Sequence, residues 1–217
     1  MKKLFYLLPT LLAAVLILGA TGCSSVYYAA YEKVGVYKRD LLKKRVIEAR
    51  DDQQVAQKEF KDALTRLKEI TSFDGGEAER AYRQLKSEYD ACASRAETVR
   101  SRIRAVESVA SDLFVEWDNE NGQISAPSLR AASRQQLADT KRRYEELHAA
   151  LIKAEQAMAP VLRQFNDYVI YLKHNLNAQA IASLNGESAS IQKEINRLLG
   201  QMNQAIARAD EFVKNMK

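Results

Sequence analysis

The residue types that most often carry chemistry are scarce in this chain and are far apart. Its 217 residues include two cysteines and two histidines. His174 has no cysteine or second histidine at metal-ligand spacing, so we expect no metal site. Cys92 falls inside an apolar repeat, where a thiol is inert packing rather than a nucleophile. Asp51 and Asp52 lie on a charged helix surface with no cleft for acid–base work. We therefore expect no enzymatic activity and no cofactor.

The overall composition favours helices and a binding or structural role. Hydrophobic residues make up 47% and charged residues 28%, which is near the average for globular proteins. Only 8 glycines and 3 prolines are present, too few for the turns of a many-stranded sheet. The formal net charge is +5 at pH 7.

The first 22 residues have the pattern of an export signal. Lys2 and Lys3 precede the apolar run 11–18, and the small residues 19–22 lead directly to Cys23. This run is too short for a membrane span and fits a cleaved leader. Small residues before a cysteine resemble the bacterial lipobox, although Ala20 stands where that motif usually has leucine. We predict a lipoprotein signal peptide over 1–22 and a single domain over 23–217 anchored through Cys23.

Two alternatives to acylation remain open. The leader is cleaved in the ordinary way and Cys23 is an incidental thiol, or the segment stays as an uncleaved membrane anchor. If Cys23 is acylated, the serine at position 24 resembles lipoproteins that are passed to the outer membrane rather than kept at the inner one. The predicted location is periplasm-facing and lipid-anchored, with the outer membrane preferred. Export also excludes nucleic acid as an ordinary partner.

Four stretches of the remaining chain carry apolar residues at steps that alternate between four and three. We call these residues the seam, because such spacing places them along one side of a helix. The first two stretches give Leu42, Val46, Ala49, Gln53, Ala56, Phe60, Ala63, Leu67 and Ile70, then Ala78, Tyr82, Leu85, Tyr89, Cys92, Ala96, Val99, Ile103, Val106, Ala110, Leu113 and Trp117. The last two give Leu137, Thr140, Tyr144, Leu147, Leu151, Ala154, Met158, Val161, Phe165, Tyr168 and Leu172, then Ile181, Leu184, Ser188, Ile191, Ile195, Leu198, Met202, Ala205, Ala209, Phe212 and Met216. Sustained seven-residue repeats indicate coiled-coil packing.

The helix-breaking residues between these stretches, mainly glycine and proline, determine the predicted topology. Helices over about 28–72 and 77–119 are joined by Phe73–Gly76, a link short enough to require an antiparallel hairpin. A third helix over about 126–175 has Ser125 or Ser128 available as its cap, with Pro160 expected to kink it. Asn185-Gly186 is expected to end a short helical piece before a fourth helix over about 187–216. The sequence thus predicts an all-α, elongated antiparallel coiled-coil bundle of three long helices and a shorter fourth.

Apolar residues beside the fourth seam leave the oligomeric state open. Leu199, Ile206 and Val213 either fill the core of the bundle or make a contact between two copies of the chain. The fuller core is the preferred interpretation.

Three further stretches together resemble a known family. They are Glu32–Asp40, Phe73–Gly76 and Tyr171–Leu184. They are similar to the domain-of-unknown-function 2959 family of Gram-negative lipoproteins, and the likeness covers nearly the whole chain after the leader. The resemblance implies an envelope location and a helical structure, and it implies no activity.

Two surfaces are candidates for binding. Near the membrane anchor, basic residues exceed acidic ones by about four charges, which suits phosphate-bearing lipid headgroups or a solvated, cross-paired surface. The candidate site residues among these basic ones are Lys38, Arg39, Lys43, Lys44, Arg45, Arg130, Arg134, Arg142 and Arg143. The opposite end interrupts the regular repeat with polar, amide-rich residues, which suit either partner contact or simple turn chemistry. The candidate residues there are Lys173, His174, Asn175, Asn177 and Asn185.

From these features the sequence favours a non-enzymatic interaction or spacer module of the outer-membrane envelope. Its partner would be the membrane through the anchor, and an envelope protein or the cell wall through the amide-rich end. The alternative is a lipid- or glycan-binding module that acts through the basic surface. The final Lys217 resembles the residue by which one abundant lipoprotein is joined to peptidoglycan, but a lysine in a last helical turn is ordinary.

Overall fold

The computed structural model describes residues 37–71 and 78–216. The predicted leader, Cys23, the link 73–76 and Lys217 lie outside these residues. All four described elements are helices: α3 (Lys38–Thr71), α4 (Ala78–Gln123), α5 (Pro127–His174) and α6 (Ala178–Asn215). The predicted all-α helical bundle is confirmed.

The chain divides into two compact units, residues 1–41 and 42–217. Within the first unit, the amides of Asp40 and Leu41 both donate to the Tyr37 carbonyl at 3.0 Å and begin α3. Lys38 and Arg39 belong to this first turn.

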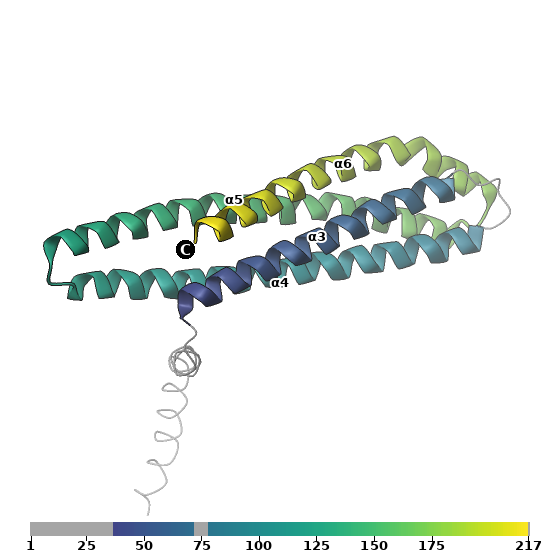
Figure 1. Cartoon of the computed structure of the whole chain (residues 1–217). Helices are drawn as coiled ribbons and strands as arrows, with labels where there is room; N and C mark the ends of the chain where they lie inside the picture. Colours follow the sequence, from purple (N-terminus) through teal and green to yellow (C-terminus); the bar gives the residue numbers. More distant parts are fainter. Residues whose placement is uncertain (1–36, 72–77, 217) are drawn as a thin grey trace, which may run out of the picture. The chain divides into compact units, whose positions relative to one another are not determined.

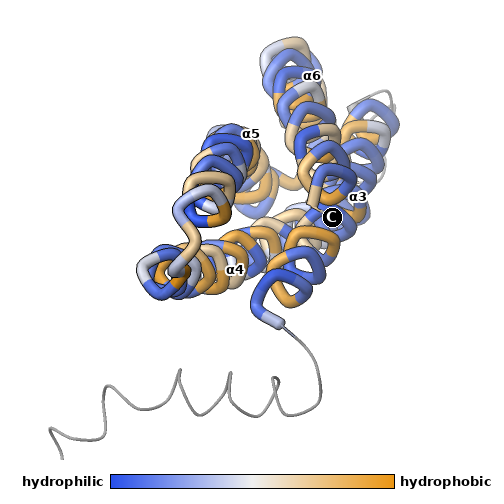
Figure 2. The backbone as a smooth tube through the Cα atoms, turned by 60° about the vertical axis from the view of Figure 1, so that its left-hand side comes forward, coloured by the Kyte–Doolittle hydropathy of each residue, from blue (hydrophilic) through white to orange (hydrophobic). Residues whose placement is uncertain are grey.

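The second unit is a bundle in which each helix packs on the next along the chain. Figure 1 shows α4 and α5 side by side, and Figure 2 shows α3 and α6 completing the four-helix arrangement. Arg102 of α4 donates to Asp52 of α3 at 2.6 Å. Between α3 and α6, Gln57 Nε2 donates to Asn203 Oδ1 at 2.7 Å. These polar contacts border the apolar interior, whose side chains face one another as the seam predicts.

Burial confirms the seam almost residue by residue. All but four seam residues are buried. The exceptions are partly exposed aromatic residues with large side chains: Tyr82, Tyr89, Trp117 and Tyr144. The alternation of four and three in the sequence therefore corresponds to the buried side of each helix.

Two boundary predictions are wrong. α6 begins at Ala178 rather than near 187 and runs through Gly186, so it has 38 residues against 34 in α3. Glycine is only mildly unfavourable inside a helix, and the buried residues on either side of Gly186 compensate. Neither Ser125 nor Ser128 caps α5. Its N-cap is Ala126, which makes no side-chain cap bond, and Pro127 follows; proline suits the first helical position because its missing N–H is not needed there.

The residues beside the fourth seam are used within the chain. Leu199, Ile206 and Val213 are all partly buried. The Leu199 carbonyl accepts a hydrogen bond from Gln57 Nε2 of α3 at 3.3 Å, which places this side of α6 against α3. The arrangement agrees with a fuller core.

Candidate functional site at the turn between α5 and α6

The turn between α5 and α6 is held by two asparagine side chains. Asn175 Nδ2 donates to the Tyr171 carbonyl at 2.9 Å, near the end of α5. Asn177 Oδ1 accepts from the Ala180 amide at 2.9 Å, and Asn177 is the N-cap of α6. Asparagine is a favoured N-cap because its oxygen satisfies an amide that has no partner within the helix. Both predicted site residues therefore shape the turn.

Around these amides the turn exposes three large apolar side chains. Ile170 is 50%, Tyr171 38% and Leu176 49% exposed, and we call these three residues the turn patch. The predicted site residues Lys173 and His174 lie between them in the chain and are also exposed. An apolar surface beside polar and basic groups is typical of a protein contact.

Sequence reasoning missed the turn patch because it looked for polar residues. The available signal was the seam itself. Ile170, Tyr171 and Leu176 are large apolar residues at positions that the four-and-three alternation does not use. A large apolar side chain outside the buried stripe of a helix must find cover elsewhere or remain exposed.

Asn185 is not part of this turn. It is exposed on α6, two helical turns beyond Asn177, and its carbonyl accepts from Ser188 Oγ at 2.8 Å. The structure thus groups Lys173, His174, Asn175 and Asn177, and it separates Asn185 from them.

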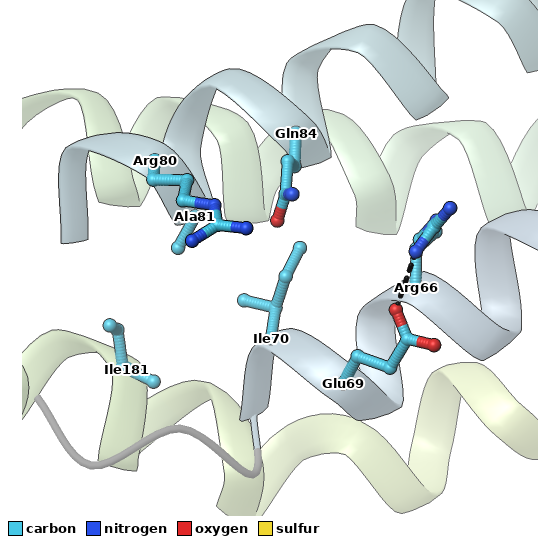
Figure 3. Close-up of a pocket in the computed structure, with 7 residues that line it drawn as sticks. All are labelled: Arg66, Glu69, Ile70, Arg80, Ala81, Gln84 and Ile181. Carbon is cyan, nitrogen blue, oxygen red and sulfur yellow. Dashed lines mark hydrogen bonds and ion pairs between the residues drawn. The ribbon is translucent and has the colours of Figure 1, made fainter. Parts of the chain in front are cut away.

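The same end of the bundle contains a cavity of about 280 Å³ between α3, α4 and α6. Figure 3 shows Ile70, Arg80 and Gln84 pointing toward a common space, with Arg66 paired to Glu69 at 2.8 Å. Its floor is apolar, since Ile70 and Ile181 are each 2% exposed. Among the described residues, the lining contains no Ser, Thr, Cys or His, and its one carboxylate, that of Glu69, is paired with Arg66. The complete lining is Arg66, Glu69, Ile70, Arg80, Ala81, Gln84 and Ile181.

Much of the predicted basic surface is engaged within the protein. Arg45 pairs with Glu48 at 2.8 Å, and Arg142 pairs with Asp139 at 3.0 Å. Arg130 Nε donates to the Ile124 carbonyl at 2.8 Å, and Arg143 donates to the Thr140 hydroxyl at 3.3 Å. Lys44 and Arg134 are exposed and Lys43 is partly buried. Within residues 37–71 and 78–216, none of these three makes such a bond. The charge available to an anionic surface is therefore smaller than the residue count indicates.

The reactive residue types lie in packing positions. Cys92 is fully buried, and burial raises the pKa of its thiol far above the ordinary range, with smaller contributions from Glu59 and Glu88. His148 Nε2 lies 2.6 Å from Glu107 Oε1, and its ring stacks on Tyr144 with centroids 5.7 Å apart. Burial, with a lesser effect of Glu107, raises the pKa of Tyr144 to about 12.

Over the described ranges, no three His, Cys, Asp or Glu side chains are grouped in a way that would hold a metal ion. In the same ranges, no helix combines the length and the apolar character required to cross a bilayer. These two findings concern residues 37–71 and 78–216 alone.

Comparison with known proteins gives one family. The sequence model of a family described as "Protein of unknown function (DUF2959)" matches residues 27–216. No curated protein matches the chain.

Proposed function

The chain belongs to the DUF2959 family of proteins of unknown function, and on that premise we propose that it is a lipid-anchored, non-enzymatic interaction module of the bacterial envelope. It would be anchored through Cys23 and face the periplasm, with the outer membrane as the preferred location. The turn between α5 and α6 would contact an envelope protein or the cell wall.

The observation that carries this proposal is the turn patch. Ile170, Tyr171 and Leu176 are three of the seven large apolar side chains that are exposed in the described part of the chain, and they lie within seven consecutive residues. Exposed apolar area costs free energy in water, about 25 cal/mol for each Å². Lys173 and His174 next to the patch would orient a partner without adding to its apolar contact.

The reactive residues support a role without chemistry. Catalysis needs a nucleophile or base in a pocket, held by a second group that orients it. The buried thiol of Cys92 has a raised pKa, which disfavours the reactive thiolate. The helices would serve instead as a spacer, since the 48 residues of α5 extend about 70 Å at 1.5 Å per residue.

The location rests on the N-terminal sequence. Lys2 and Lys3, the apolar run 11–18, the small residues 19–22 and Cys23 together form the lipoprotein leader pattern. A diacylglyceryl group with an amide-linked acyl chain gives the several chains that stable anchoring requires.

Photo-crosslinking in cells tests the proposed contact. A benzoylphenylalanine residue replaces His174, which is exposed and whose side chain does not cap a helix. The matched control replaces Asn196, which is exposed in the middle of α6. The proposal predicts one discrete adduct from position 174 that position 196 does not give.

The alternative function is binding of lipid or glycan through the basic surface. The observation that favours it is the pair Lys43 and Lys44, for which the described residues provide no ion pair. If this surface docks on headgroups, Lys43→Glu with Lys44→Glu would abolish salt-sensitive binding to anionic vesicles. Unchanged vesicle binding by the double variant would exclude the alternative.

A further inference from the structure

We propose that the end of the bundle opposite the turn patch binds a second copy of this chain. The binding surface is the two-helix end, which consists of Val115–Gln123 of α4 and Pro127–Leu137 of α5. Two such hairpins, related by a two-fold axis, would pack into a four-helix bundle.

The two-helix end extends beyond the other helices. Three contacts set the register: Asp52 with Arg102 between α3 and α4, Glu107 with His148 between α4 and α5, and Tyr144 with Phe212 between α5 and α6. Counting along the antiparallel helices, Leu42 of α3 comes level with about residue 112 of α4. The end of α6 comes level with about residue 140 of α5. Figure 1 shows the hairpin continuing past the C-terminal end of α6.

The last layer of the four-helix part is aromatic. Tyr144 packs edge-on against Phe114, with centroids 5.4 Å apart, and against Phe212 at 6.4 Å. Beyond this layer neither α6 nor the Leu42–Thr71 part of α3 lies alongside α4 and α5. Within residues 42–71 and 78–216, the hairpin is therefore formed by α4 and α5 alone.

Two large apolar side chains are exposed on this end. Val115 is 61% and Leu129 64% exposed, more than any residue of the turn patch. Trp117 is partly exposed, and its Nε1 donates to Ser133 Oγ across the hairpin at 2.9 Å. This bond fixes the indole ring between the two helices, so the surface of the hairpin around Trp117 has a defined shape.

The distribution of charge on the hairpin favours a second copy of this chain as the binding partner. Between Val115 and Gln123, α4 carries three acidic residues and no basic one. Between Pro127 and Leu137, α5 carries Arg130 and Arg134 and no acidic residue. A two-fold axis places α4 of each copy against α5 of the other, so opposite charges meet twice. Pairing α4 with α4 would oppose like charges and is disfavoured. The exposed members of this arrangement are Asp118, Glu120 and Arg134.

A buried polar residue lies within the hairpin of the single chain, where it bears on how α4 and α5 pack on each other. Asn121 in the hairpin is 1% exposed, and its amide has no hydrogen-bond partner among the described residues. Single buried asparagines in coiled coils fix the register and number of helices at a cost in stability. For contact with a second copy, the hairpin thus offers exposed apolar residues and self-complementary charge.

The test uses the full chain in cells, expressed in two copies with different epitope tags. Benzoylphenylalanine replaces Leu129, and the matched control replaces Leu176 in the turn patch. We expect an adduct of about twice the chain mass that carries both tags from position 129 and not from position 176. The proposal would be overturned if position 129 gave no self-adduct, or if both positions gave equal self-adducts. It would also be overturned if position 129 crosslinked to another protein or only within one chain.

Charge reversal then tests the pairing. Asp118→Arg with Glu120→Arg makes both helices of the hairpin basic, so the self-adduct should fall about tenfold, which corresponds to about 1.4 kcal/mol. Adding Arg134→Glu places an exposed carboxylate on α5 opposite the two new arginines and should recover the adduct. A self-adduct that neither change affects would contradict the two-fold arrangement. These outcomes do not depend on the turn patch, so they are distinguishable from failure of the proposed function.

Discussion

Asn177 Oδ1 accepts a hydrogen bond from the Ala180 amide at 2.9 Å and thereby caps the first turn of α6. The side chain that the sequence marks as a binding residue is thus occupied with a structural bond. Replacing it would weaken the helix that positions the turn, and a loss of binding would not identify the contact. The contact is better tested by substituting Ile170, Tyr171 or Leu176, whose side chains are exposed.

The cap gives a first prediction. Asn177→Ala should lower the free energy of unfolding by about 1 kcal/mol, since an N-cap oxygen is lost. Asn177→Asp should retain most of that stability because a carboxylate also caps and suits the helix dipole. Urea denaturation followed by circular dichroism measures both. Asn185→Ala, an exposed replacement further along α6, is the control and should stay within about 0.5 kcal/mol.

Gln53 gives a second prediction. It is fully buried on α3, and neither polar atom of its amide has a partner among the described residues. Gln53→Met keeps the length of the side chain and removes the unpaired groups, so stability should rise by about 1–2 kcal/mol. Gln54→Met, at an exposed neighbouring position, should change it little. A marked loss of stability in Gln53→Met would indicate that the amide is bonded, for instance to a buried water.

Cys92 links stability to pH. Burial raises the pKa of its thiol in the folded chain, so the unfolded chain releases this proton first. The buried, protonated thiol therefore contributes to the free energy of unfolding. This contribution is fully present below the thiol pKa of the unfolded chain, about 8.5, and it falls by about 1.4 kcal/mol for each pH unit above that value. Urea denaturation at pH 7.5 and 9.5 should show a steeper loss for the parent than for Cys92→Ala. Equal slopes would show that the thiol is not protected by burial.

The anchor gives a fourth prediction. In Gram-negative cells fed radiolabelled palmitate, the full chain should incorporate label and sediment with the membranes. Cys23→Ala should abolish both, because the acylated residue is removed. A labelled Cys23→Ala chain would place the acyl group elsewhere, and an unlabelled parent would contradict the lipoprotein assignment.

The fold follows from the sequence because a coiled coil is specified by a local repeat. Alternating steps of four and three select one side of each helix, and nearly every residue so selected is buried. The boundaries were less predictable. Gly186 lies inside α6 because the buried residues around it outweigh the small cost of glycine in a helix.

The sequence predicted where the turn between α5 and α6 lies, but not which of its side chains are exposed. The break in the repeat at Lys173–Asn177 located the turn, since a coiled coil cannot reverse without one. The roles of Asn175 and Asn177 depend on where α5 ends and α6 begins, which the repeat fixes only to within several residues. The seam marks Ile170 and Leu176 as lying outside the buried stripe of their helices, but the local pattern does not say whether a neighbouring helix covers them.

The most direct test of the account is the crosslinking yield from position 174 in two backgrounds. Benzoylphenylalanine at His174 is introduced into the parent chain and into Ile170→Ser with Leu176→Ser, with circular dichroism confirming that both fold. The account predicts one discrete envelope adduct in the parent and about a tenfold lower yield in the double variant, about 1.4 kcal/mol. The account would be contradicted by a missing adduct in the parent, or by one that the two serines leave unchanged.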